Sequence, residues 1–82
     1  MDLRQQIRDH IIEQLLHREE PEGFDDDYNL IDAGIMDSLA IMNMVTYLEQ
    51  QAGIEFGDED IVPEHFNSID ALASFAEQKR AG

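Results

Sequence analysis

Ser38 is the residue of this chain whose position best suits attachment chemistry. It follows Asp37 and precedes an apolar pattern with helical spacing. A helix N-terminus favours a phosphate through its free N–H groups and its dipole. Ser38 is therefore predicted to be a place where a phosphodiester can be attached. Four apolar residues around the serine are predicted to be an exposed patch that a partner recognises: Ile35, Met36, Leu39 and Met42.

A second interpretation needs no attachment. Asp37 or Ser38 could act only as the helix cap, a role that typically contributes about 1 kcal/mol. The chain would then be a non-catalytic acidic helical adaptor, and its Leu39/Met42 patch would bind a protein partner. The residues alone leave both interpretations open.

The acidic loop after residue 24 matches only the first part of a calcium-binding loop. Asp25, Asp27 and Asn29 match the first three ligand positions of an EF-hand loop. Leu30 then stands where the loop requires glycine, and Met36 stands where it requires a bidentate glutamate. No tight metal site is predicted there.

The histidines do not form a catalytic or metal-binding pattern either. His10 and His17 lie two turns apart on one predicted helix, whereas two ligands of one metal need i, i+4 spacing. His65 belongs to another segment. A domain this small also has little room for a pocket that encloses a substrate. The chain is therefore predicted to have no catalysis of its own.

Composition limits the partners. The 82 residues include 19 acidic and five basic ones, which gives a net charge of -14. Nucleic acid and anionic membrane surfaces are disfavoured, because binding to both depends on Lys and Arg. Partners with basic surfaces are favoured. The chain has no cysteine, no apolar leader and no stretch that could span a membrane, so a cytoplasmic protein is expected. We also expect it to be a monomer.

Apolar spacing predicts three main helices. The first runs from about Leu3 to His17, with Asp2 as its N-cap. The second starts near Asp37 or Ser38 and runs to about Ala52, where Gly53 ends it. Its core stripe is predicted to be Ile41, Met44, Val45, Leu48 and Ala52.

The third main helix is predicted to follow Ser68 as its N-cap. Its inner face is expected to be Ile69, Leu72, Ala73 and Ala76, with Phe75 beside it. Residues 54–56 read as a short extended piece, and Pro63 allows a short helix or turn. Residues 18–36 read as a long ordered loop, in which Gly34 takes an unusual backbone conformation. The fold class is thus all-α: a small four-helix bundle in one domain, residues 1–82, with three main helices, one short helix and a long loop between the first two.

The chain resembles the acyl carrier protein family, including its peptidyl and aminoacyl carriers. Five stretches carry the resemblance: Leu30–Gly34, Asp37-Ser38-Leu39, Leu48-Glu49, Ile54-Glu55-Phe56 and Phe66–Leu72. The resemblance implies a right-handed four-helix bundle and a 4′-phosphopantetheine arm esterified to Ser38. It also implies that a phosphopantetheinyl transferase installs the arm from coenzyme A and that Asp37 assists. Acyl or aminoacyl groups would then be carried as thioesters on the arm's thiol.

The second helix departs from the pattern of fatty-acid-type carriers. Those proteins tend to have acidic residues two and five positions after the serine, where this chain has Ala40 and Asn43. The departure favours a carrier of specialised or secondary metabolism over bulk fatty acid synthesis. The expected partners are an acyl- or aminoacyl-activating ligase and downstream biosynthetic enzymes with basic surfaces.

Overall fold

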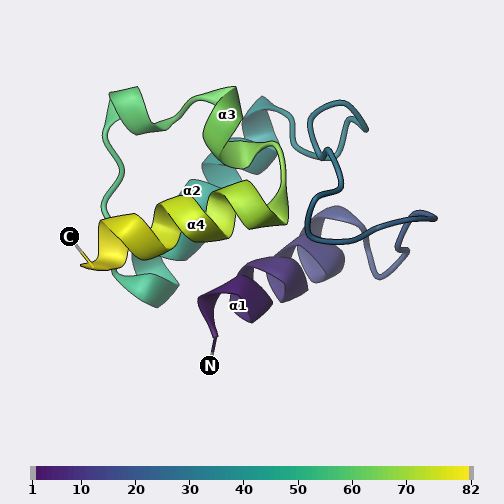
Figure 1. Ribbon diagram of the computed structural model, residues 1–82, viewed down its shortest axis with the longest axis horizontal. Helices are drawn as coiled ribbons and strands as arrows, with labels where there is room; N and C mark the ends of the chain where they lie inside the picture. Colours follow the sequence, from purple (N-terminus) through teal and green to yellow (C-terminus); the bar gives the residue numbers. More distant parts are fainter. Residues whose placement is uncertain (1, 82) are drawn as a thin grey trace.

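Every regular element in residues 2–81, the part of the chain that the computed structural model describes, is helical (Figure 1). The predicted all-α fold, with three main helices and one short helix, is confirmed. The α-helices are α1 (Leu3–His10), α2 (Ser38–Ala52), α3 (Pro63–Phe66) and α4 (Ile69–Ala81). A π-helical turn, η1 (Ile11–Leu15), extends α1, and a 3-10 turn, η2 (Asp58–Asp60), precedes α3. None of the helices in this range has both the length and the apolar character that crossing a bilayer requires.

The first helix is shorter and less regular than its apolar spacing predicts. It changes to π geometry at Ile11, where the Leu16 N–H bonds back five residues to the Ile11 carbonyl at 3.0 Å. His17 and Arg18 then have positive φ angles of 50° and 68°, so the prediction that the helix reaches His17 is wrong. His17 and Arg18 leave helical geometry, and the Arg18 N–H donates to the Ile12 carbonyl at 2.8 Å, a hydrogen bond typical of helix C-termini. Asp2 lies at the N-cap position, but its side chain makes no cap hydrogen bond.

One face of α2 lies in the core, and it is turned slightly from the predicted stripe. Its buried residues are Ala40, Met44, Val45 and Leu48. Ile41 and Ala52, both predicted on the core stripe, are only half-buried. The reason is that Ala40, Met44 and Leu48 follow one another at intervals of four and point inward together.

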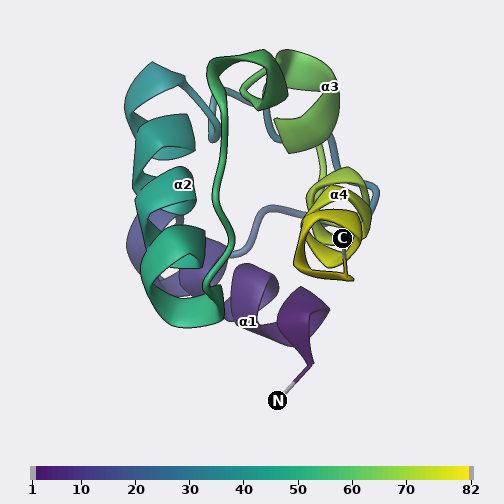
Figure 2. The same ribbon diagram turned by 90° about the vertical axis from the view of Figure 1, so that its left-hand side faces the viewer.

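The last helix starts where the sequence predicts. The Ser68 hydroxyl accepts a hydrogen bond from the Ala71 N–H at 3.0 Å, as an N-cap should. Its predicted inner face is fully buried: Ile69, Leu72, Ala73 and Ala76. In Figure 2, which looks along α4, α2 lies on the opposite side of the bundle and α1 crosses its base.

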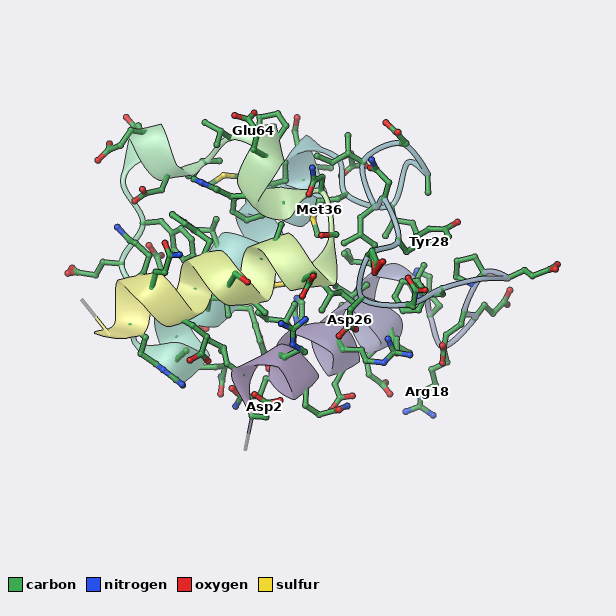
Figure 3. The ribbon with its side chains drawn as sticks, viewed as in Figure 1. Asp2, Arg18, Asp26, Tyr28, Met36 and Glu64 are labelled. Carbon is green, nitrogen blue, oxygen red and sulfur yellow. The ribbon has the colours of Figure 1, made fainter. Side chains whose placement is uncertain are left out.

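Basic residues near the N-terminus hold the long loop against the bundle. Arg4 contacts the carboxylates of Asp70 at 2.6 Å and Asp26 at 3.1 Å, and these hydrogen bonds raise the pKa of Arg4. The Asp70 N–H also donates to the Asp26 carbonyl at 2.8 Å. Asp26 is labelled in Figure 3, where the loop passes α1. The predicted ordered loop is therefore anchored on two helices at once.

A second ion pair anchors the segment between α2 and α3. Lys79 Nζ on α4 lies 2.8 Å from Asp60 Oδ2, and the Gly57 N–H donates to the same oxygen at 2.9 Å. His65 Nδ1 on α3 lies 2.9 Å from the Asp60 carbonyl, and its ring stacks on Phe75 at 3.7 Å. The bond to Lys79 is the main reason that the pKa of Asp60 is lowered.

This geometry makes the stability contribution of Asp60 depend on pH. Asp60→Asn keeps an acceptor for the Gly57 N–H but removes the charge. Because folding lowers the pKa of Asp60 below its ordinary value of 3.8, the stabilisation is present above that value and is lost as the pH falls through the lowered one. We expect the wild type to have the higher melting temperature at neutral pH, with the gap closing as the pH falls below 3.8.

The measurement is thermal unfolding by circular dichroism across that pH range. Asp58→Asn is the matched control, because Asp58 is an exposed carboxylate on the same turn and has no ion pair within residues 2–81. A gap between wild type and Asp60→Asn that stays constant or widens in acid would contradict the assignment.

Candidate functional site

Ser38 is exposed and is the first residue of α2. Asp37, in extended backbone geometry, is the N-cap: its Oδ1 accepts the Ala40 N–H at 2.9 Å. Its carbonyl accepts the Ile41 N–H at 2.8 Å. Of the two residues that could cap the helix, the structure therefore uses Asp37, and the Ser38 hydroxyl makes no hydrogen bond within residues 2–81. A free hydroxyl at this place can serve as a nucleophile or as an attachment point.

The turn before the site fixes the place where α2 begins. The Leu30 carbonyl accepts both the Ile35 N–H at 2.9 Å and the Met36 N–H at 3.0 Å. Gly34 takes a φ of +76°, which confirms its predicted unusual backbone and suits a residue without Cβ. Leu30 itself is fully buried, and its N–H donates to the Asn67 carbonyl at 2.8 Å. The start of α2 is thereby tied to the core and to the residues before α4.

The predicted apolar patch is smaller than the sequence suggests. Leu39 is 83% exposed and Met42 is 51% exposed, and Ile35 is half-buried beside them. Met36 was predicted to belong to this patch, but it is only 2% exposed. The two hydrogen bonds to the Leu30 carbonyl turn its side chain into the core, and Figure 3 labels it within the bundle. Met36 is thus a packing residue that supports the site from beneath.

Two adjoining surface hollows lie beside the attachment position, between α2 and the α1–η1 segment. The larger measures about 500 Å³ and is lined by His10, Gln14, Leu39, Met42, Asn43, Thr46, Tyr47 and Gln50. The smaller measures about 360 Å³ and is lined by Gln14, Leu15, Gly34, Ile35, Asp37, Leu39, Ala40 and Asn43. Three residues line both: Gln14, Leu39 and Asn43. We refer to the two together as the α1–α2 groove.

Sequence reasoning missed the role of His10 in this groove. His10 Nε2 lies 2.8 Å from Asn43 Oδ1, and its ring stacks on Tyr47 with centroids 4.0 Å apart. Asn43 and Tyr47 are four residues apart, so α2 presents both to the same neighbour. That i, i+4 pair, outside the core stripe predicted for α2, is the signal that could have pointed to a contact with another helix.

The residues that partly matched a calcium loop make local turns instead. Asp25 Oδ1 accepts the Asp27 N–H at 3.2 Å, and Asn29 Oδ1 accepts the Asp32 N–H at 2.9 Å. Across residues 2–81 no three His, Asp or Glu side chains come together as ligands of one metal ion. These oxygens stabilise the bends of the loop.

Charge is unevenly distributed around the site. Residues 19–78 contain no Lys or Arg, and seven acidic residues fall between positions 19 and 32. By contrast, α2 carries a single charged side chain, Glu49. The exposed side of α2 is therefore close to neutral in a strongly anionic protein.

Unfolding experiments can test whether Asp37, and not Ser38, caps α2. Asp37→Ala removes the acceptor for the Ala40 N–H, so we expect the free energy of unfolding in urea to fall by about 1 kcal/mol. Ser38→Ala removes an exposed hydroxyl without a partner, so its effect should stay within about 0.5 kcal/mol. If Ser38→Ala were as costly as Asp37→Ala, Ser38 would be sharing the cap.

Comparison with known proteins identifies the family to which the chain belongs. The family described as "Phosphopantetheine attachment site" matches residues 5–76. A similar protein, "Probable acyl carrier protein PigG" of Serratia sp. (strain ATCC 39006), is 28% identical over 79 residues, which cover 96% of this chain and 90% of that protein. A chain in a solved structure titled "Crystal structure of FAD-dependent dehydrogenase" is 30% identical with a TM-score of 0.76, over 85% of this chain and 97% of that one. The chain belongs to the phosphopantetheine-dependent carrier protein family, and its cofactor is covalently attached 4′-phosphopantetheine.

Proposed function

We propose that Ser38 holds the 4′-phosphopantetheine arm and that the chain presents acyl or aminoacyl groups, bound to the arm as thioesters, to partner enzymes. The observation that carries the proposal is the exposed Ser38 hydroxyl at the first residue of α2, with the cap supplied by the neighbouring Asp37. When bound, the arm supplies the thiol that this cysteine-free chain lacks. The whole chain acts as one monomeric, cytoplasmic carrier domain and leaves catalysis to its partners.

The attachment step follows from the chemistry of a free hydroxyl. Ser38 Oγ attacks the phosphorus of coenzyme A that bears the pantetheine, and a new O–P bond forms. The bond between that phosphorus and the bridging oxygen breaks, so 3′,5′-ADP leaves with the electron pair. The Ser38 proton passes to a base of the transferase. The exposed hydroxyl leaves the approach to Oγ open, and the N-terminus of α2 favours the new phosphodiester.

Asp37 can take part in this step without leaving its structural role. One of its carboxylate oxygens, Oδ1, accepts the Ala40 N–H, and the residue as a whole is exposed. The other oxygen can therefore face the transferase and contact the Mg²⁺ ion that accompanies coenzyme A. The same carboxylate would cap the helix and orient the reacting groups.

Partner enzymes would recognise α2 chiefly through shape and apolar contact. Leu39 and Met42 are the exposed large apolar side chains of the described residues, and both lie within one turn of Ser38. The acidic segments on either side of α2 would draw basic partner surfaces towards it. A nearly neutral recognition helix supports a carrier of specialised metabolism, and the similarity to a protein named as a probable acyl carrier supports the carrier role itself.

Loading by a transferase tests the proposal directly. The purified chain is incubated with coenzyme A, Mg²⁺ and a broad-specificity phosphopantetheinyl transferase, and its intact mass is then measured. We expect a gain equal to one phosphopantetheine group, which peptide fragmentation places on Ser38. An unchanged mass would leave the adaptor interpretation as the better one.

Two variants control the loading experiment. Ser38→Ala should stay folded and gain no mass. Asp37→Asn keeps an oxygen that accepts the Ala40 N–H but lacks the charge, so its stability should stay close to wild type while its loading slows. Loading of Asp37→Asn at the wild-type rate would limit Asp37 to its role as cap.

The solved structure also suggests a partner class. Because the match covers 97% of its chain, the matched chain is about as short as this one, and it occurs in a crystal structure of an FAD-dependent dehydrogenase. We therefore propose that a flavin-dependent dehydrogenase acts on the loaded carrier. Such an enzyme removes two hydrogens from the cargo, one as a proton to an enzyme base and one as a hydride to FAD.

This partnership can be followed through the flavin. The carrier is loaded in turn with small acyl and aminoacyl groups and mixed, without oxygen, with the dehydrogenase of the matched structure. For a suitable cargo we expect bleaching of the flavin absorbance and a cargo lighter by two hydrogen atoms, with a slower reaction for Met42→Arg. Equal rates for the carrier and for a free pantetheine thioester would show that the carrier surface is not recognised.

A further inference from the structure

We propose that the arm attached to Ser38 rests in the α1–α2 groove when no partner is bound. The inference assumes the proposed attachment at Ser38 and adds the place where the attached chain lies. The groove begins at Asp37, next to Ser38, and continues along α2 to Gln50.

The two hollows share Gln14, Leu39 and Asn43, and the smaller one reaches Asp37, the residue before Ser38. Leu39, Asn43, Thr46 and Gln50 recur along one side of α2 at helical spacing, and Gln14 faces them from η1. The distance along the helix from residue 38 to residue 50 is about 18 Å at 1.5 Å per residue. A groove of this length can hold an extended chain such as the pantetheine arm, and not only one small chemical group.

The lining suits the chemistry of the arm. Beyond its phosphate, pantetheine is uncharged: it has two amides, one hydroxyl, a pair of geminal methyl groups and a thiol. The larger hollow is lined without any Asp, Glu, Lys or Arg, although the chain carries a net charge of -14. The amides of Gln14, Asn43 and Gln50 can pair with the arm's amides, and Leu39 and Met42 offer apolar contact to its methyl groups.

Part of the groove is held in position in advance. His10 Nε2 donates to Asn43 Oδ1, because an amide oxygen can only accept, and the ring of His10 is supported by Tyr47. Tyr47 in turn donates from its hydroxyl to the Gln6 carbonyl at 3.5 Å. The Asn43 amide is thereby fixed with its NH₂ group free to donate to a carbonyl of the arm. A fixed donor loses little conformational entropy on binding.

Nuclear magnetic resonance compares the chain before and after loading. The ¹⁵N-labelled protein is measured in both forms, and contacts are sought between the geminal methyl protons of the arm and the protein. We expect contacts to Met42 and the Tyr47 ring, and shift changes that extend from residue 39 to residue 50 and across to Gln14. Changes confined to residues 37–39, or centred on α3, would overturn the proposal.

The reactivity of the thiol gives a second readout with a matched pair of variants. Thr46→Trp places a bulky ring in the middle of the groove at an exposed position, whereas Gln51→Trp places the same ring on α2 outside it. If the arm rests in the groove about two thirds of the time, alkylation of the wild-type thiol is about threefold slower than that of an undocked arm. Thr46→Trp should restore the faster rate, and Gln51→Trp should not.

The outcomes separate this inference from the proposed function. A chain that gains no mass on treatment with the transferase refutes the attachment itself. A chain that is loaded, but shows no contacts along α2 and the same alkylation rate in both variants, keeps the carrier role and refutes the groove. Because the contacts are measured on the wild type, a Thr46→Trp variant that failed to fold would still leave the proposal open to refutation.

Discussion

The hydrogen bonds at the Leu30 backbone fix where α2 begins, and the exposure of Ser38 depends on them. The Leu30 N–H is held by Asn67, its carbonyl receives the Ile35 and Met36 N–H groups, and its side chain is fully buried. Since the turn is anchored on both sides, Met36 enters the core and Asp37 reaches the cap position. The capping carboxylate then leaves the next side chain without a structural task. A carrier needs such a residue: chemically free, but rigidly placed.

The few basic residues have a structural role that shapes the rest of the surface. Arg4 and Arg8 hold Asp26 of the long loop, and Lys79 holds Asp60 of the segment before α3. Each of these pairs joins parts of the chain that are distant in sequence, and each is partly exposed, so its energetic contribution is modest. Their larger effect is on the pattern of charge. Because the Lys and Arg residues lie before residue 19 and after residue 78, residues 19–78 present only negative charge, and α2, with Glu49 alone, is the nearly neutral exception.

Much of the fold could be predicted because helical periodicity and caps are local. The inner face of α4, the Ser68 cap and the positive φ of Gly34 follow from nearest neighbours along the chain. Met36 could not be placed in the same way, because its burial depends on a loop carbonyl six residues away. The π turn at Ile11 and the contact of His10 with Asn43 depend on how α1 meets α2, and a single-helix pattern does not contain that information. The position of Ser38 was predictable; the groove beside it required the tertiary structure.

The proposed resting place of the arm and the proposed partner contact use the same side chains of α2, so binding of the arm and binding of a partner are coupled. Leu39 and Met42 line the groove where the arm would rest, and they are also the exposed apolar contacts for a partner. An enzyme that covers these two residues would compete with the resting arm, so its binding would shift the arm out of the groove. By linkage, the resting arm would weaken partner binding by the same factor. The arm would then be held against α2 between visits and released at the moment when a partner docks.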